Sequence, residues 1–161
     1  MTTNFEIKPA TINDAQTIVD LIKAIAEYEK LSDQVQATPE TIIEHLFSHK
    51  SYAECIIAFE NNEPIGFALF FHNFSTFVSK PGIYLEDLFV LESHRGKGYG
   101  KKLLLQVIAL AKQRNCGRVD WSVLNWNKPA IDFYESLGAT AMNEWTTYRL
   151  NEEKISTLLN K

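Results

Sequence analysis

The sequence predicts a single domain, residues 1–161, with a mixed α/β fold in which an α+β mixed sheet is flanked by helices. Three observations lead to this fold class. Apolar residues recur at helical spacing toward both ends of the chain, whereas the middle holds short runs rich in β-branched and aromatic residues. A glycine-rich turn then separates one of these runs from a long amphipathic segment. With 161 residues, 45% of them apolar, the chain can bury one sizeable core but is short for two ordinary domains.

The first third of the chain predicts a short strand followed by two helices. Thr11 and Asp14 have the spacing of a capping box, which places a helix start there. Thr38 is followed by a proline, which is favoured at the first position of a helix. The predicted elements are a strand over 5–7 and helices over 11–30 and 38–47.

Two apolar runs in the middle predict an antiparallel hairpin. They cover residues 55–59 and 65–71, and the polar segment 60–64 between them is typical of a turn. A looser stretch, 73–82, leads to a third predicted strand over 83–90.

The amphipathic segment after the glycine-rich turn predicts a long helix that stops near Gly117. Its expected apolar face consists of Leu103, Leu104, Val107, Ile108 and Ala111. The remaining predicted elements are a strand over 118–124, a helix over 127–137 that ends at Gly138, and a last strand over 146–150. Antiparallel strands therefore come first, and a β-α-β unit follows.

The charge balance and the termini exclude several classes of protein. Sixteen basic and twenty acidic residues give a formal net charge of −4, which disfavours nucleic acid as the main partner. The same balance is compatible with a cationic substrate. The first residues lack the basic start and apolar stretch of a signal peptide. No run reaches the roughly eighteen apolar residues of a membrane span, so no membrane association is expected.

The two cysteines, Cys55 and Cys116, have neither metal-ligand spacing nor partner histidines, so we expect no metal site. We interpret them as buried free thiols of a cytoplasmic protein, because reduced thiols persist in that compartment. A catalytic thiol is the alternative.

The glycine-rich turn, Arg95-Gly-Lys-Gly-Tyr-Gly-Lys101, is the most informative segment. Placed between a strand and a helix, it leaves several backbone N–H groups without helical partners, and glycines allow a phosphate to approach closely. The helix dipole and nearby cations favour an anion there. The turn does not fit the P-loop, because no glycine is separated by four residues from a Gly-Lys-Ser/Thr, and it does not fit the G-x-G-x-x-G fingerprint, because position 101 is lysine. We therefore predict a phosphate or diphosphate site; the alternative is a tight turn with glycines for geometry alone.

Within this turn, Arg95-x-x-Gly98-x-Gly100 resembles the Q/R-x-x-G-x-G/A pyrophosphate motif of the GNAT superfamily of acetyl-CoA-dependent N-acetyltransferases. The context, after a central strand and before a long helix, is similar too. Four segments resemble the diamine acetyltransferase branch, which includes the spermidine/spermine and thialysine acetyltransferases: residues 7–11, 26–29, 84–87 and 126–134.

The resemblance implies a GNAT acyl-CoA N-acyltransferase fold, in which a splayed central sheet is flanked by helices and two parallel strands separate to admit the pantetheine of acetyl-CoA. Acetyl-CoA is then the co-substrate. The implied cofactor-binding residues are Leu88, Phe89, Val90, Arg95, Gly96, Lys97, Gly98, Tyr99, Gly100, Lys101, Asn127, Pro129 and Ala130. Asn127 is also a good helix N-cap, and both roles are compatible.

Two residues are predicted to be catalytic. An alkylamine has a pKa near ~10.4, so it arrives protonated and must lose a proton before it attacks a thioester. Glu86, on the strand that lines the implied cleft, is the candidate to bind the ammonium and pass on its proton; the alternative is an ordinary exposed pair with Asp87. Tyr134 matches the family's proton donor to the leaving thiolate, although it could equally be core packing.

The acceptor side is predicted from the same resemblance. Tyr28, Glu29 and Glu86 match substrate-binding positions, whereas Tyr28 and Glu29 could instead be a solvated helix end. One departure concerns position 146: the polyamine enzymes resemble Glu-Gly-Trp-Arg-Leu there, and this chain begins the segment with Thr146. That difference argues against long polyamines. His72 is a weaker candidate for a ligand or base.

The sequence therefore predicts an N-acetyltransferase that acts on a primary amine of a small diamine, polyamine or lysine-like substrate by direct transfer. A protein lysine or N-terminal acetyltransferase and a non-catalytic CoA-binding regulator are the alternatives. A homodimer is expected, since the resembling branch forms dimers and a partner would cover Phe74 and Phe77.

Overall fold

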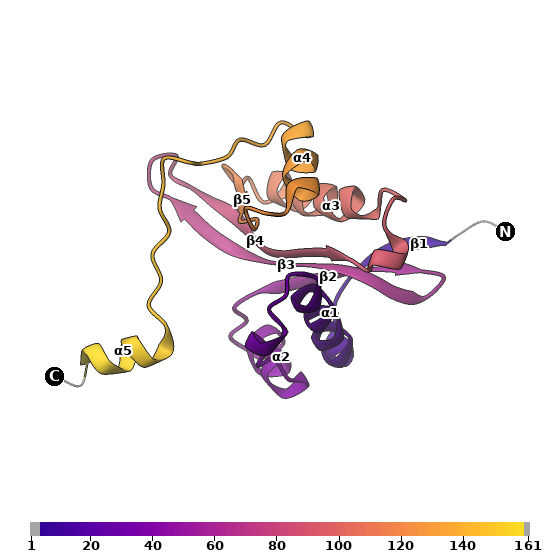
Figure 1. Ribbon diagram of the computed structural model, residues 1–161, viewed down its shortest axis with the longest axis horizontal. Helices are drawn as coiled ribbons and strands as arrows, with labels where there is room; N and C mark the ends of the chain where they lie inside the picture. Colours follow the sequence, from indigo (N-terminus) through magenta and orange to yellow (C-terminus); the bar gives the residue numbers. More distant parts are fainter. Residues whose placement is uncertain (1–3, 160–161) are drawn as a thin grey trace. The chain divides into compact units, whose positions relative to one another are not determined.

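The computed structural model describes residues 4–159, which form five strands and five α-helices with short 3₁₀ turns between them (Figure 1). The strands are β1 (Phe5–Pro9), β2 (Glu54–Glu60), β3 (Glu63–Ser75), β4 (Lys80–Val90) and β5 (Val119–Trp121). The helices are α1 (Ala15–Tyr28), α2 (Pro39–Leu46), α3 (Tyr99–Gln113), α4 (Lys128–Ser136) and α5 (Glu152–Leu159). The chain divides into a first compact unit that ends at Ser122 and a second that begins at Val123.

The sheet lies in the first unit and has the strand order β1-β2-β3-β4-β5. The first four strands are antiparallel, and β5 pairs parallel with β4 through α3, as the predicted β-α-β unit requires. This pairing covers only Ile83–Leu85 of β4 and Val119–Trp121 of β5. Among the described residues, positions 86–90 of β4 therefore have no strand partner on that side. β5 ends at Trp121, so the strand predicted over 118–124 is shorter than expected, while β4 continues beyond the last parallel pair.

Helices cover both faces of this sheet: α1 and α2 lie on one face, and α3 lies on the other (Figure 1). On the α1 face, Ile18 and Val19 pack into one buried cluster with Ile57, Phe67 and Phe89 from three strands. On the opposite face, the buried side chains of α3 are Tyr99, Leu103, Leu104, Val107 and Ala111. The predicted mixed α/β fold is confirmed.

The predicted helix starts are confirmed by their capping contacts. The Asp14 carboxylate accepts hydrogen bonds from the backbone N–H of Thr11 at 2.7 Å and from its hydroxyl at 2.9 Å. The first turn, Ile12–Asp14, is 3₁₀, and α1 follows it. Thr38 caps α2 by accepting from the backbone N–H of Thr41 at 3.3 Å. Local sequence alone therefore determines where both helices begin.

The looser stretch predicted over 73–82 is wrong. β3 and β4 continue through it as a long hairpin that turns only between Ser75 and Lys80. Gly82 interrupts the sequence signal for a strand, yet the backbone needs it there. A Cβ at this position would lie 2.3 Å from Oδ1 of Asn73 on the neighbouring strand. Glycine thus marks a close approach inside the hairpin rather than a loop.

The long helix ends earlier than predicted and at a different residue. Asn115, with φ 55°, takes the left-handed position after α3, and its N–H donates to the carbonyl of Lys112. The N–H of Cys116 donates to the carbonyl of Ala111, which completes a Schellman motif. Ile108, predicted on the apolar face, is 39% exposed in the first unit because only one stripe of a helix can face the sheet.

The second unit contains α4, which Asn127 caps as predicted by accepting from the N–H of Ala130 at 3.4 Å. The strand predicted over 146–150 is wrong. These residues are exposed and pair with no other strand in the described part of the chain, so the alternating pattern has no ladder to join. The helix α5 follows instead, capped by Asn151, whose Oδ1 accepts from the N–H of Lys154 at 3.0 Å. Over residues 4–159, no helix has the length and apolar character needed to cross a membrane.

Candidate functional site

The turn between β4 and α3 presents a row of unused backbone donors. Within residues 4–159, no backbone N–H of residues 96–101 donates a hydrogen bond. The next N–H along the chain, that of Lys102, donates to the carbonyl of Gly98. These groups are the orphan donors of the α3 N-terminus extended by the glycine turn. Such a concavity binds an anion, and the predicted phosphate site is geometrically available.

Two glycines give the turn its shape. Gly96 has φ 79° and Gly98 has φ 78°, both in the left-handed region that other residues adopt at a cost. A Cβ at either position would meet nothing within 4 Å, so open space lies above both of them. An approaching phosphate would occupy that space. The donor row and this open space together fit the diphosphate of acetyl-CoA.

Arg95 uses its side chain to hold the turn in place. Its Nε donates to the carbonyl of Val90 at 2.9 Å, and its guanidinium lies 4.2 Å from the ring centre of Tyr28 and 5.3 Å from that of Phe89. The carbonyl of Val90 is therefore already bonded. For pantetheine this leaves the other backbone groups of the predicted segment Leu88, Phe89 and Val90.

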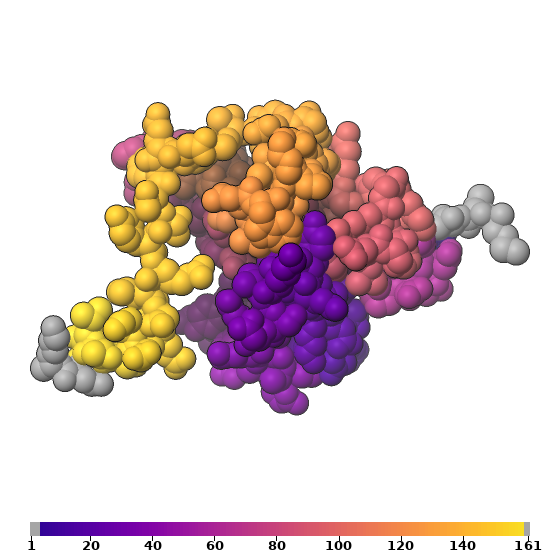
Figure 2. All heavy atoms as spheres, in the orientation of Figure 1, coloured from indigo at the N-terminus to yellow at the C-terminus, as the bar shows by residue number. Residues whose placement is uncertain are grey.

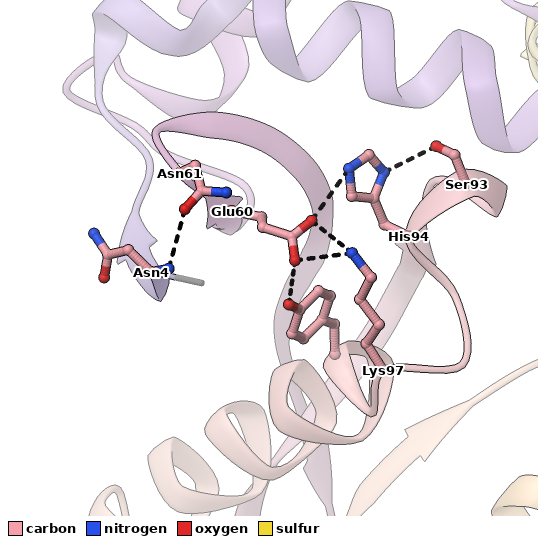
Figure 3. Close-up of polar contacts among 7 residues, drawn as sticks. Asn4, Glu60, Asn61, Ser93, His94 and Lys97 are labelled. Atoms are coloured by element: carbon pink, nitrogen blue, oxygen red, sulfur yellow. Dashed lines mark hydrogen bonds and ion pairs between the residues drawn. The ribbon is translucent and has the colours of Figure 1, made fainter. Parts of the chain in front are cut away.

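The other loop cations are arranged differently from what the sequence predicts. Nζ of Lys97 lies 2.9 Å from each carboxylate oxygen of Glu60, and the hydroxyl of Tyr99 donates to the same carboxylate (Figure 3). Nζ of Lys102 lies 4.6 Å from the ring centre of Phe5. Lys97 is half exposed, and its charge is paired with Glu60, so it is not a free cation of the turn.

Three carboxylates gather where β4 meets the end of α1. The Asp87 carboxyl is partly buried, and burial together with the nearby charges of Glu86 and Glu29 raises its pKa from 3.8 to about 7. Burial also raises the pKa of Glu29. The pairing register shifts between Leu69 and Phe70, which leaves the exposed Glu86 as an extra residue in β4. The cluster combines negative charge for a cation with one group that titrates near neutral pH.

The end of α1 also borders an open cleft of about 630 Å³, beside the segment that follows β4. In Figure 2 the violet spheres of the N-terminal helices lie against the coral spheres of the chain after β4. The lining residues are Ala24, Glu27, Tyr28, Lys30, Phe89, Leu91, Glu92 and Ser93. The ring centres of Tyr28 and Phe89 are 6.3 Å apart on its wall. Tyr28, predicted to bind substrate, thus contacts Arg95 at the start of the glycine-rich turn.

Cys55 is poorly suited to act as a nucleophile. Burial, together with the charges of Asp87 and Asp14, raises the pKa of its thiol to about 12. A thiol with that pKa is protonated at neutral pH and is a poor nucleophile. Cys116 is half-buried rather than buried, which corrects the prediction. Within residues 4–159, no group of three or more His, Cys, Asp or Glu side chains is placed to hold a metal ion.

The remaining predicted residues lie elsewhere. In the second unit, Asn127 is buried at the start of α4, Pro129 and Ala130 form its first turn, and Tyr134 lies 5.4 Å from Phe133 between ring centres. In the first unit, His72 is exposed, with Nε2 3.5 Å from Arg114. Arg114 in turn binds Glu54, so His72 belongs to a surface ion-pair group apart from the acidic cluster.

Sequence reasoning missed the roles of two acidic residues, Glu60 and Asp87. Glu60 begins the segment 60–64, which the sequence predicts as a turn, and nothing in the sequence indicates its contacts, because its partners lie more than thirty residues away along the chain. Asp87 did carry a signal in the sequence. Adjacent residues of a strand point to opposite faces, so one of the Glu86-Asp87 pair had to face the interior.

Comparisons with known proteins agree with this geometry. The model of the acetyltransferase (GNAT) family matches residues 16–139. Thialysine N-epsilon-acetyltransferase of Bos taurus is 34% identical to this chain, over 96% of this chain and 97% of that protein. L-ornithine N5-acetyltransferase of Arabidopsis thaliana is 44% identical over 93 residues, which are 58% of this chain and 41% of that one. Among solved structures, an integron cassette protein of V. cholerae has a TM-score of 0.81 and 30% identity, with 98% of both chains covered.

Proposed function

The chain belongs to the GNAT family of acetyltransferases, as the pyrophosphate motif predicted, and we propose that its acceptor is a short diamine or a lysine-like amine. It is an N-acetyltransferase, and its family uses acetyl-CoA. The relatives named for thialysine and ornithine, both small molecules with an amine beside other charged groups, support this acceptor class.

The acidic cluster is the observation that carries the proposal. Glu29, Glu86 and Asp87 place negative charge together at the end of β4, a few residues before the anion-binding turn. An acceptor with two cationic groups can leave one of them paired with a carboxylate while the other loses its proton. A monoamine would leave part of the cluster without a counter-charge, which is unfavourable in a partly buried site.

Residues 95–101 and the segment Leu88–Val90 would hold acetyl-CoA, which supplies the thioester that reacts with the amine. The donor row of the turn would bind the diphosphate, and the unpaired edge of β4 would bind pantetheine. Asn127, Pro129 and Ala130 remain predicted cofactor contacts. Tyr134 remains the proposed proton donor, since a phenol with a pKa near ~10 is protonated at neutral pH.

Asp87 is better suited than Glu86 to accept the proton of the amine. A general base is most effective when its pKa lies near the working pH, and burial brings that of Asp87 to about 7. Glu86 is exposed, so its carboxylate is placed to attract and hold an ammonium. We propose this division of roles in place of proton transfer by Glu86.

We also propose a homodimer. The tip of the β3–β4 hairpin exposes Phe74 at 59%, Phe77 at 96% and Val78 at 53% of their surfaces. Three neighbouring apolar side chains of this size are usually covered by a partner. The sequence predicts a homodimer, so the proposed partner is a second copy of the chain.

Steady-state acetylation of putrescine, ornithine, thialysine, butylamine and a lysine peptide tests the acceptor class. We expect the diamines and amino-acid amines to be the better substrates by kcat/KM. A preference for the peptide or for butylamine would contradict the proposal, and no turnover with tight CoA binding would indicate a regulator.

The pH profiles of Asp87→Asn and Glu86→Gln test the proposed roles of these two carboxylates. The rise in kcat/KM near pH 7 should disappear in Asp87→Asn and persist in Glu86→Gln with a higher amine KM. The opposite pattern would indicate that Glu86, and not Asp87, is the general base.

A further inference from the structure

Glu60 occupies a defined position at the end of β2. The next two residues, Asn61 and Asn62, have φ of 53° and 68° and form a two-residue turn of the kind that suits a tight hairpin. Glu60 therefore pairs directly with Glu63 across the turn. Its side chain is 8% exposed, although it carries a carboxylate.

Three side chains from residues 94–99, the segment that we call the cofactor loop, converge on this carboxylate (Figure 3). Nζ of Lys97 lies 2.9 Å from both oxygens, the Tyr99 hydroxyl donates to Oε1, and Nε2 of His94 lies 3.4 Å from Oε2. In the sequence, His94 precedes Gly96, Lys97 lies between the two glycines, and Tyr99 follows Gly98. One carboxylate from a different strand therefore contacts the loop on both sides of its two glycines.

These contacts oppose the conformational freedom that the glycines bring. Glycine loses more backbone freedom than other residues when it is ordered, so a loop with two of them is costly to fix on binding a ligand. Lys97 lies between the two glycines and is fixed by two contacts. Tyr99 is fixed twice, because its ring also stacks on Phe5 with centres 4.2 Å apart and planes within 9°. The backbone between them is ordered before any ligand arrives.

We propose that Glu60 is a positioning residue for the diphosphate of acetyl-CoA. It does not touch the ligand; it holds Lys97 and Tyr99 so that the backbone N–H groups of residues 96–101 already face the binding space. This inference rests on the proposed acetyl-CoA site, and no function of this kind is implied by the motif itself.

A purely electrostatic role for Glu60 predicts the opposite result. Removing its charge would free the Lys97 ammonium for the anion and would strengthen CoA binding. Positioning predicts that the loss of order outweighs this gain. Ordering one residue costs a free energy equivalent to about tenfold in affinity, so Glu60→Gln should weaken CoA binding by about that factor.

Calorimetric titration with CoA distinguishes the positioning role from the electrostatic role. The proteins compared are the wild type, Glu60→Gln, Lys97→Met and the double variant. If Glu60 positions the loop, each single variant binds about tenfold more weakly, and the double variant is no weaker than the worse single one. If charge dominates, Glu60→Gln binds more tightly and the double variant resembles the wild type, which would overturn the inference. Glu63→Gln, the exposed neighbour across the turn, is the matched control and should bind as the wild type does.

Kinetics with two acyl donors supply the second readout. With acetyl-CoA, Glu60→Gln should raise the KM of the donor and leave kcat unchanged at saturation. With S-acetylpantetheine, which lacks the diphosphate, its kcat/KM should equal that of the wild type. Equal losses with both donors would mean that Glu60 only supports the fold, and the inference would be wrong.

Folding and the underlying function are checked in the same experiment. Tyr99→Phe removes a single hydroxyl from the cluster, should fold, and should show a smaller loss of the same kind. Wild-type protein that fails to bind CoA would refute the proposed function itself. Wild-type binding together with unchanged affinity in Glu60→Gln and Tyr99→Phe would refute only the role of Glu60.

Discussion

The guanidinium of Arg95 lies 4.2 Å from the ring centre of Tyr28, so the end of α1 supports the first residue of the glycine-rich turn 95–101. The same guanidinium is bonded to the carbonyl of Val90. A cation held over an aromatic face is stabilised by about 0.5–2 kcal/mol. Tyr28 therefore connects the proposed acceptor side of the site to the proposed cofactor side through one contact.

Substitution of Tyr28 tests which side it serves. Tyr28→Phe keeps the aromatic face and should leave the KM of acetyl-CoA close to that of the wild type. Tyr28→Leu removes it and should raise that KM several-fold, because Arg95 loses its support. Steady-state kinetics with each substrate varied in turn give the answer. A rise in the KM of the amine in Tyr28→Phe would instead show that the hydroxyl contacts the acceptor.

Gly98 should be essential for CoA binding through both its conformation and its missing side chain. Gly98→Val should fold but lose most of its affinity, because a branched side chain would fill the open space above the turn. Gly98→Asn separates the two causes, since asparagine tolerates positive φ. We expect its thermal stability to stay near that of the wild type while its CoA affinity, measured by calorimetry, still falls. Unchanged affinity in a folded Gly98→Val would contradict the phosphate site.

The buried carboxyl of Asp87 should destabilise the protein at neutral and alkaline pH. Its pKa is about 7 in the folded state against 3.8 ordinarily, so the folded state binds the proton more tightly. Stability therefore falls as the pH rises from about 4 to about 7, by up to about 4 kcal/mol. Asp87→Asn should have a higher free energy of unfolding than the wild type at pH 8, and a smaller gain at pH 5. Urea unfolding at both pH values measures this, with Glu86→Gln as the exposed control; an equal effect at both would contradict the raised pKa.

The two cysteines should differ in reactivity. Because burial raises the pKa of Cys55 to about 12, its thiol should be alkylated very slowly by iodoacetamide at pH 7.5. Cys116 is half-buried and should react first. Mass spectrometry of peptides over time follows both sites in one sample, and Cys55→Ala should retain activity. Faster labelling of Cys55, with loss of activity, would revive the catalytic thiol.

The oligomeric state should depend on the hairpin tip. We expect sedimentation velocity to give twice the chain mass of 18.4 kDa for the wild type. Phe77→Ser removes the most exposed aromatic ring of the tip and should shift the protein toward monomer. Tyr52→Ser changes an exposed aromatic elsewhere, at 59% exposure, and should not. A monomeric wild type at working concentrations would contradict the homodimer.

Features with local causes could be predicted from the sequence. Thr11, Asp14 and Thr38 determine helix starts within one turn, and the positive φ of Gly96 and Gly98 follows from the local glycine pattern of 95–101, whereas the anion site itself stays a prediction. Features that depend on distant partners could not. The contacts of Glu60 join residues more than thirty positions apart, and burial rather than residue type sets the pKa of Asp87. α5 had a readable local signal in Asn151 and the two glutamates after it, which the alternation over 146–150 obscured.

The tight turn at Asn61 and Asn62 has a consequence for engineering this enzyme. Hairpin tips with small polar residues are ordinarily the places where a chain accepts a tag, a linker or an inserted domain. Here Glu60, the residue just before the tip, holds Lys97 of the glycine-rich turn, so lengthening the hairpin turn would disrupt the pairing of Glu60 with Glu63 and displace the carboxylate from Lys97. An insertion at the exposed tip Asn61–Asn62 should therefore weaken the binding of acetyl-CoA, although the tip itself lies outside the proposed site.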